Sequence, residues 1–371
     1  MPFPVRKALL VVLTAVLLHV GMLAIYVGKY GDLSALVGAS FSAVGQPPLE
    51  QVTIGIGPGG YDGMFYYAIA QNPWVPHTLG IDAPAFRHVR VLYPICCWAL
   101  SAGGDPQLLL WVMPLVNLMA IAGLTWLGAW VAWKYDRNPW WGLVVPLAVS
   151  ACIPAARNLT DNLSTLAVFA LLAAWLLDRP WWLLTLLALA AVFTREQNVL
   201  VVGIVLATAA WTRRGAVAGG MAFALAAWFG WIHLLKWVYG VSPLDIGVKV
   251  FSVPLEGLTY AWTHLGGYHG STRLAIVNGL SLLHMALFLA LGAYVVWQRR
   301  SGAVVLVVLA AMGMALLATD ALWNDLVSYR RALVWLPLGL WLTGVQANQR
   351  WLLCCLIPAG LFSLAVALRF A

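Results

Sequence analysis

Long apolar runs, separated by short polar joints, fill this sequence from one end to the other. Apolar side chains make up 63% of the residues and charged side chains 9%, and a globule of this composition would not stay soluble in water. A helix needs about 20 residues to cross the hydrocarbon of a bilayer, where every backbone polar group has to be hydrogen-bonded within the chain. The sequence therefore predicts an all-α fold, a polytopic transmembrane helical bundle.

The apolar runs predict about eleven crossings or half-crossings. We place them at 7–28, 107–134, 139–156, 161–178, 181–194, 198–212, 215–237, 273–298, 302–321, 331–347 and 351–370. The first run follows Arg6 and Lys7, is longer than the core of a signal peptide and lacks a small-x-small cleavage site, so we expect it to be retained. Residues 1–371 are expected to form a single transmembrane domain without a separate soluble domain.

Basic residues in the joints indicate the orientation, because cytoplasmic loops of membrane proteins are enriched in lysine and arginine. If the N-terminus is cytoplasmic, the inner joints hold ten of the 21 basic residues and two of the 13 acidic ones. The outer joints are then longer and hold the other carboxylates. The net charge of +8 is a signal of topology rather than of nucleic-acid binding, and the function is expected on the extracytoplasmic face.

The largest outer segment, residues 29–106, is predicted to contain short helices. A first one, lying in the membrane interface, follows from apolar residues at helical spacing, namely Leu33, Leu36, Val37, Phe41 and Val44. Residues 45–60 are rich in proline and glycine and are predicted to form a loop, and a second helix is expected over 61–72. The segment 87–104 is too short to span, so we expect it to return to the same face, near the level of Asp62.

Asp62 is the first candidate for chemistry, because it is a carboxylate in an aromatic-rich segment of this outer loop. Tyr66 follows four residues later and lies on the same face of the predicted helix. An aspartate at the start of a helix is also a good N-cap, and the two roles can coexist. Tyr66 and Tyr67 are also typical of interfacial anchors, so that interpretation stays open.

Charged side chains near membrane depth are costly and are usually paired or functional. The candidates include Arg157, Asp161, Arg195, Glu196, Arg330 and Arg331. Arg195 and Glu196 interrupt an apolar stretch between two short predicted spans, so the break is expected to lie within a cavity. A structural ion pair, of Arg195 with either Glu196 or Asp161, is the alternative to a functional role.

No compact spacing of metal ligands occurs in the sequence, so no metal ligand is predicted. Outer carboxylates and histidines are chemically able to hold a divalent ion such as Mg²⁺ or Mn²⁺, and that question stays open. The five cysteines lie in apolar runs, which is not the pattern of a disulfide framework.

Five segments carry a resemblance to a known family by their order and placement. They are Asp62-Gly63-Met64-Phe65-Tyr66-Tyr67-Ala68-Ile69-Ala70, Arg90-Val91-Leu92-Tyr93-Pro94, Arg157-Asn158-Leu159-Thr160-Asp161-Asn162, Phe193-Thr194-Arg195-Glu196-Gln197-Asn198 and Ser328-Tyr329-Arg330-Arg331. This layout resembles the GT-C superfamily of membrane glycosyltransferases, in particular the GPI mannosyltransferase branch and bacterial cell-surface glycopolymer proteins. Two features depart from it: Asp82 is only a loose candidate for a second acidic motif, and we expect no soluble outer domain for acceptor recognition.

The resemblance implies inverting transfer of a sugar from a polyprenyl-phosphate carrier to a hydroxyl of a glycan or lipid acceptor, with residues 29–106 as the outer catalytic loop. The reaction would take place outside a bacterial inner membrane, for assembly of cell-envelope glycan or glycolipid. Asp62 would act as the base and Arg195 would stabilise the departing phosphate. Further clamp candidates are Arg157, Arg330 and Arg331, and Arg87 or Arg90 would serve the acceptor. The other predicted substrate-binding residues are Tyr66, Asp161, Glu196 and Tyr329.

Two other classes of protein stay open. A transporter or lipid flippase for an envelope precursor often has an internal repeat and ionisable groups at mid-membrane, but no repeat is visible, and outside Arg195 and Glu196 the carboxylates lie at the ends of spans. A non-catalytic scaffold would leave the clustered outer aspartates and arginines unexplained. For the loop 238–272, a lid over the site and a plain connection are equally open.

Overall fold

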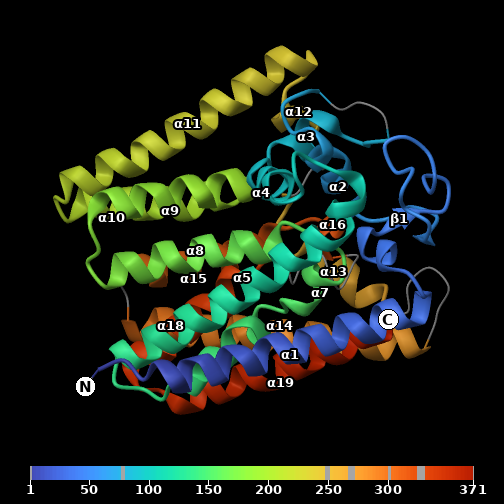
Figure 1. Ribbon diagram of the computed structural model, residues 1–371. Coiled ribbons are helices and arrows are strands. Elements are labelled where there is room, and N and C mark those ends of the chain that lie inside the picture. The colour runs from blue at the N-terminus through green and yellow to red at the C-terminus, as the bar shows by residue number, and fades with distance from the viewer. Residues whose placement is uncertain are drawn as a thin grey trace.

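The structure, a computed structural model, describes residues 2–76, 80–246, 251–265, 272–299, 302–323 and 331–370. Helix makes up 74% of it and strand 2%, which confirms the predicted all-α class. The long helices pack into one bundle, and the short elements of the first outer loop gather at the end opposite the N-terminus (Figure 1).

Four helices within the described ranges are long and apolar enough to cross a membrane. They are α1 (Val5–Tyr30), α5 (Pro106–Lys134), α11 (Gly215–Tyr239) and α14 (Thr272–Arg299). In α1, Leu9, Leu13 and Leu17 recur every fourth residue and are all exposed, so they form one apolar row on the helix surface. Lipid is the environment in which such a row is stable, and the helices are those of a membrane protein.

Shorter helices occupy most of the other predicted spans. They are α8 (Asp161–Leu176), α9 (Trp181–Thr194), α10 (Asn198–Trp211), α15 (Ala303–Leu317), α18 (Trp335–Ala347) and α19 (Arg350–Phe370). Most of them are shorter than the about 20 residues that a perpendicular crossing requires. The count of eleven crossings therefore stays a prediction.

The span predicted over 139–156 was wrong as a single helix. The structure divides this stretch into η2 (Pro139–Leu143), α6 (Val144–Ala148) and α7 (Cys152–Ala155). Ser150, between the last two, has a φ of 59°, which no right-handed helix accommodates. Pro146 and Pro154 have no backbone N–H to donate. These local breaks are invisible to hydropathy, which averages over the whole stretch.

The helix predicted over 33–44 ends early. η1 (Leu33–Val37) is a 3-10 helix whose first turn is capped by Asp32, which accepts a hydrogen bond from the Ser34 backbone nitrogen at 2.7 Å. Gly38 then has a φ of 73°, a left-handed conformation that ends the helix. Beyond it, β1 (Ala39–Ser40) pairs in parallel with β2 (Gly55–Gly57).

α2 (Gly63–Gln71) forms where the sequence predicts a second helix, and every residue from Gly63 to Ala70 is buried. It packs into a second apolar core with η1, α4 (Leu92–Leu100) and the start of α5. Tyr66 and Tyr67 are fully buried, and the Tyr67 hydroxyl donates to the Pro106 carbonyl oxygen at 2.8 Å. The interfacial interpretation of these tyrosines was therefore wrong, because protein covers both of them.

Short helices complete the same end of the bundle. They are α3 (Pro84–His88), α12 (Pro243–Ile246), α13 (Glu256–Thr263) and α16 (Asp320–Trp323). The segment before α13 is tied to the end of α15, since the Ser252 backbone nitrogen donates to the Leu317 carbonyl oxygen at 2.8 Å. The predicted loop 238–272 lies partly outside the described residues, and its role as a lid stays open.

Candidate functional site

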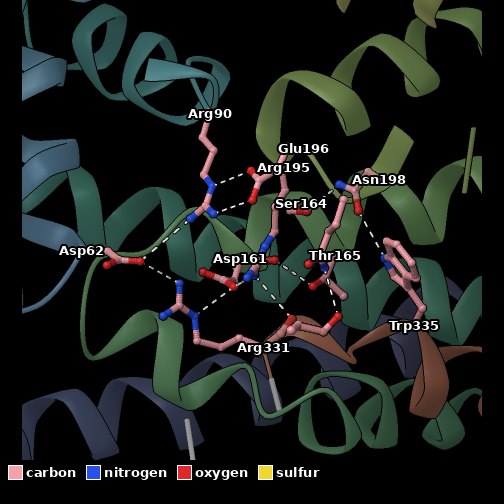
Figure 2. A network of polar contacts seen from close by, with 12 residues as sticks. Asp62, Arg90, Asp161, Ser164, Thr165, Arg195, Glu196, Asn198, Arg331 and Trp335 are labelled. Atoms are coloured by element: carbon pink, nitrogen blue, oxygen red, sulfur yellow. Dashed lines mark hydrogen bonds and ion pairs between the residues drawn. The ribbon is translucent and has the colours of Figure 1, made fainter. Parts of the chain in front are cut away.

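Asp62 stands at the N-cap position of α2, yet its side chain makes no capping hydrogen bond. The carboxylate instead faces three guanidinium groups. Its Oδ1 lies 3.0 Å from Arg87 Nη1, and its Oδ2 lies 3.2 Å from Arg331 Nη2 and 3.9 Å from Arg90 Nη1. Figure 2 shows the contacts with Arg90 and Arg331. The Asp62 side chain is 21% exposed, so solvent reaches it at the edge of this group.

The position of Asp62 depends on a close backbone contact at Gly63. A Cβ there would lie 2.6 Å from the Val37 carbonyl oxygen and closer still to that of Arg157. We expect Gly63→Ala to destabilise the protein by about 1–3 kcal/mol through overpacking, measured as a lower melting temperature in detergent. Gly57→Ala is the matched control, because a Cβ on Gly57 meets nothing within 4 Å. An equal loss in both variants would contradict the packing argument.

Arg87 and Arg90 reach this group from α3 and the turn after it. Arg87 also binds Asp82, with its Nε and Nη2 each 2.9 Å from a carboxylate oxygen. Arg90 holds Glu196 in the same way, at 2.7 and 2.6 Å, and donates from Nη1 to the Tyr66 hydroxyl at 2.7 Å. Bidentate pairs of guanidinium and carboxylate are strong and directional, so both arginines are held in defined orientations.

Asp161, the first residue of α8, is the buried end of the same group. Its Oδ1 accepts a hydrogen bond from Arg331 Nε at 3.1 Å and forms an ion pair with Arg195 (Figure 2). Only 5% of the Asp161 side chain is exposed. Arg331 therefore connects a buried carboxylate, Asp161, with the solvent-accessible carboxylate of Asp62.

Two supporting residues were not singled out from the sequence. Asn198, at the start of α10, donates to Ser164 Oγ at 2.7 Å and accepts from Trp335 Nε1 at 3.2 Å (Figure 2). These bonds tie the break between α9 and α10 to α8 and α18. Tyr61 places its hydroxyl oxygen 3.4 Å from Arg331 Nη1. The sequence offered one sign of the role of Asn198, which is a polar amide close to Arg195 and Glu196 in an otherwise apolar stretch.

These contacts define an arginine–carboxylate cluster. Its members are Asp62, Asp82, Arg87, Arg90, Asp161, Arg195, Glu196 and Arg331. All were predicted as site residues except Asp82, the loose candidate, which joins through Arg87. Of the two ion pairs considered for Arg195, the one with Asp161 forms and the one with Glu196 does not. The predicted site residues Tyr329 and Arg330 lie outside the described residues.

Arg157 lies beside the cluster and differs from its arginines. It forms no ion pair with a carboxylate of the described residues. Its guanidinium donates to the Tyr26 hydroxyl and lies 5.0 Å from the centre of the Tyr26 ring and 5.9 Å from that of Tyr61. The four arginines of the cluster face four carboxylates, whereas the Arg157 guanidinium is held by the Tyr26 hydroxyl and by the rings of Tyr26 and Tyr61.

The surrounding charges control the ionisation of Asp62. Burial by itself would raise the pKa of this carboxyl group, but the guanidinium groups of Arg331, Arg87 and Arg90 outweigh burial and lower the pKa to about 2. Asp62 is therefore ionised at neutral pH. It is also a weak base for as long as all three arginines face it.

Acid should weaken the folded protein through Asp62. Its pKa falls from an ordinary value of 3.8 to about 2 on folding, so its stabilising contribution is complete above about pH 4 and is lost as the pH falls toward about 2. This lowering corresponds to about 2 kcal/mol. We expect the stability difference between the wild type and Asp62→Asn to shrink by about that amount between about pH 5 and pH 2, measured by thermal unfolding. A difference that does not change with pH would contradict this assignment.

The carboxylates and histidines of the described residues were compared with the requirements of a metal site. Within the described ranges, no three histidine, cysteine, aspartate or glutamate side chains form a group that could hold a metal ion. The carboxylates of the cluster are each paired with arginine instead. The divalent ion considered from the sequence stays an open prediction.

Known proteins provide no further guide to the site. No protein-family model matches this chain, and neither a curated protein nor a solved structure matches it. The GT-C resemblance consequently depends on the five sequence segments. The chemistry has to be inferred from the geometry of the cluster.

Proposed function

We propose that the protein is a membrane glycosyltransferase that takes a sugar from a polyprenyl-phosphate carrier at the extracytoplasmic end of the bundle. The observation that carries this proposal is the position of Asp62, a solvent-accessible carboxylate within 3.9 Å of three guanidinium groups. Sugar transfer from a phosphate carrier requires a group that accepts a proton and cations that hold the leaving phosphate. The cluster offers both at one place.

Convergence of the family-like segments supports the same proposal. Each of the five segments contributes at least one residue that contacts the cluster or belongs to it: Asp62, Arg90, Asp161, Arg195 with Glu196, and Arg331. These residues are spread over nearly the whole chain. Structural ion pairing alone would not require that the segments resembling a glycosyltransferase be the ones that meet.

The proposed reaction is a single displacement with inversion. The acceptor hydroxyl oxygen attacks the anomeric carbon while the bond from that carbon to the carrier phosphate breaks, and the polyprenyl phosphate leaves with the electron pair. The hydroxyl proton passes to a carboxylate oxygen of Asp62. A phosphate bound to the neighbouring arginines would cancel part of their positive charge and raise the pKa of Asp62, so the base becomes stronger when the donor is present.

We assign the phosphate clamp to Arg87 and Arg157 rather than to Arg195. Arg195 is buried, and its Nη1 is engaged by Asp161 and by the Arg331 carbonyl oxygen at 3.4 Å. Its proposed role is to hold Asp161 and, through Asp161, to position Arg331. Arg157 can bind an anion without giving up an ion pair to a described carboxylate. Arg87 contacts Asp62 directly, and its side chain is more exposed than that of Arg195.

Purified protein in lipid nanodiscs is the material for the direct test. With a polyprenyl-phosphate-linked sugar and a hydroxyl acceptor, it should release polyprenyl phosphate and form a glycosylated product, both detected by mass spectrometry. Mass spectrometry of lipids that co-purify with the protein would identify the carrier to supply. A cysteine introduced into residues 29–106 should react with a membrane-impermeant reagent in intact cells, as the proposed orientation in a bacterial inner membrane requires.

A transporter or lipid flippase is the second candidate, and one observation favours it. The ion pairs continue from the exposed Asp82 to Asp161 inside the bundle, and buried ionisable chains often mark transport pathways. Movement of the carrier-linked sugar across sealed liposomes without covalent change would support this candidate. If the protein moved the carrier-linked sugar in this way and formed no glycosylated product, the glycosyltransferase proposal would be overturned.

A further inference from the structure

Asp82 occupies the outward edge of Arg87. That guanidinium uses Nη1 for Asp62 at 3.0 Å and turns its Nε and Nη2 to the two oxygens of Asp82 at 2.9 Å. Such a two-donor edge fits two oxygens of a phosphate as well as those of a carboxylate. Asp82 is also the most exposed carboxylate of the cluster, at 55% against 21% for Asp62. Water can therefore solvate the Asp82 carboxylate at low cost if that carboxylate moves away from Arg87.

We propose that Asp82 is a built-in competitor of the carrier phosphate. In the free protein it fills the Nε and Nη2 edge of Arg87, and it leaves when the carrier phosphate binds there, as the diester of the sugar-linked donor or as the monoester of the released polyprenyl phosphate. This inference rests on the proposed function, because it takes the carrier phosphate as the ligand. Arg87 would then hold the phosphate with Nε and Nη2 and the Asp62 carboxylate with Nη1. The leaving phosphate and the proposed base, Asp62, would thus contact the same guanidinium.

Arg87 does not need Asp82 in order to stay in place. Its guanidinium lies 4.7 Å from the centre of the Phe65 ring and 5.8 Å from that of Phe86, and it keeps the ion pair with Asp62. These contacts approach it from α2 and α3, independently of the Asp82 carboxylate. Removing Asp82 should consequently expose a binding edge that is already oriented.

Asp82→Asn is the variant that tests this inference. Asparagine retains the Oδ1 that accepts a hydrogen bond from the Ala83 backbone nitrogen at 2.7 Å, while it removes the charge that competes for Arg87. We expect the dissociation constant for farnesyl phosphate, measured with the full chain in nanodiscs, to fall by about fivefold. Binding of farnesol, which lacks the phosphate, should not change.

Glu50→Gln is the matched control. Glu50 is an exposed carboxylate of the same outer loop that forms no ion pair with a described basic residue, so its removal should affect farnesyl phosphate binding less than Asp82→Asn does. In an Arg87→Ala background, the gain from Asp82→Asn should disappear. A gain that persists without Arg87 would overturn the inference.

Two results of the Asp82→Asn measurement would also overturn it. Weaker binding would mean that Asp82 positions Arg87 for the ligand, and unchanged binding would mean that the phosphate binds elsewhere. Because binding is measured without sugar transfer, the outcome is separate from that of the proposed function. Tighter binding by Asp82→Asn, in a protein that transfers no sugar, would support the competitor and reject the glycosyltransferase.

Discussion

Asp62→Asn should slow sugar transfer by about 10²- to 10⁴-fold, the range that a positioned proton acceptor contributes to a rate. Asparagine has nearly the size of aspartate, but its amide does not take up a proton at neutral pH. The acceptor hydroxyl would therefore have to attack without a base. The measurement is the rate at which purified protein in nanodiscs releases polyprenyl phosphate at saturating donor.

This variant should fold, because each arginine that contacts Asp62 keeps a second carboxylate. The remaining pairs are Arg87 with Asp82, Arg90 with Glu196, and Arg331 with Asp161. Binding of the polyprenyl phosphate should persist in the variant, which separates loss of chemistry from loss of the site. Glu50→Gln removes an exposed outer-loop carboxylate and should transfer sugar at the wild-type rate. Full activity in Asp62→Asn would reject the assignment of Asp62 as the base.

Asp161→Ala should lower the free energy of unfolding by about 3–5 kcal/mol, the usual cost of removing one partner from a buried ion pair. Asp161 contacts both Arg195 and Arg331. Without it Arg331 keeps Asp62, whereas Arg195 loses its only ion pair to a described carboxylate and leaves an uncompensated charge in the interior. Thermal unfolding in detergent, together with the yield of folded protein, measures the loss.

The exposed pair of Asp178 with Arg214 is the control for this prediction. Its atoms are 3.1 Å apart and the Asp178 side chain is 83% exposed, so Asp178→Ala should cost no more than about 1 kcal/mol. Adding Arg195→Met to Asp161→Ala should restore part of the stability, since the unpaired charge is gone. If Asp161→Ala were no more damaging than Asp178→Ala, the buried pair would not have the energetic role assigned to it.

Helix positions followed closely from the apolar runs. The prediction of 181–194 coincides with α9, and that of 215–237 differs from α11 only at its end. An apolar stretch that must satisfy its own backbone hydrogen bonds has little choice but to be helical, so local composition is enough to locate it. The stretch 139–156 is the exception, because Pro146, Pro154 and the left-handed Ser150 break an otherwise apolar run.

Membership of the cluster was also largely readable from the sequence, but the pairing within it was not. Charged residues are only 9% of this chain, so those in outer or interrupted segments stand out. Arg195 has φ −161° and ψ 130°, and successive side chains of extended backbone point to opposite sides. Glu196 therefore turns away from Arg195 and pairs with Arg90, 106 residues earlier in the chain.

The amino-acid sequence by itself determined that this chain is a helical membrane protein and that its charged residues concentrate in a few segments, because hydrophobicity and backbone hydrogen bonding act locally. Only the tertiary structure decided that Asp62 faces three arginines, that Arg195 belongs to Asp161 and that Asp82 covers Arg87. Those contacts depend on how the starts of α2, α3 and α8, the break between α9 and α10 and the residues just before α18 converge. An ion pair forms over a few ångströms between side chains that lie far apart in the sequence, and no local pattern specifies that distance.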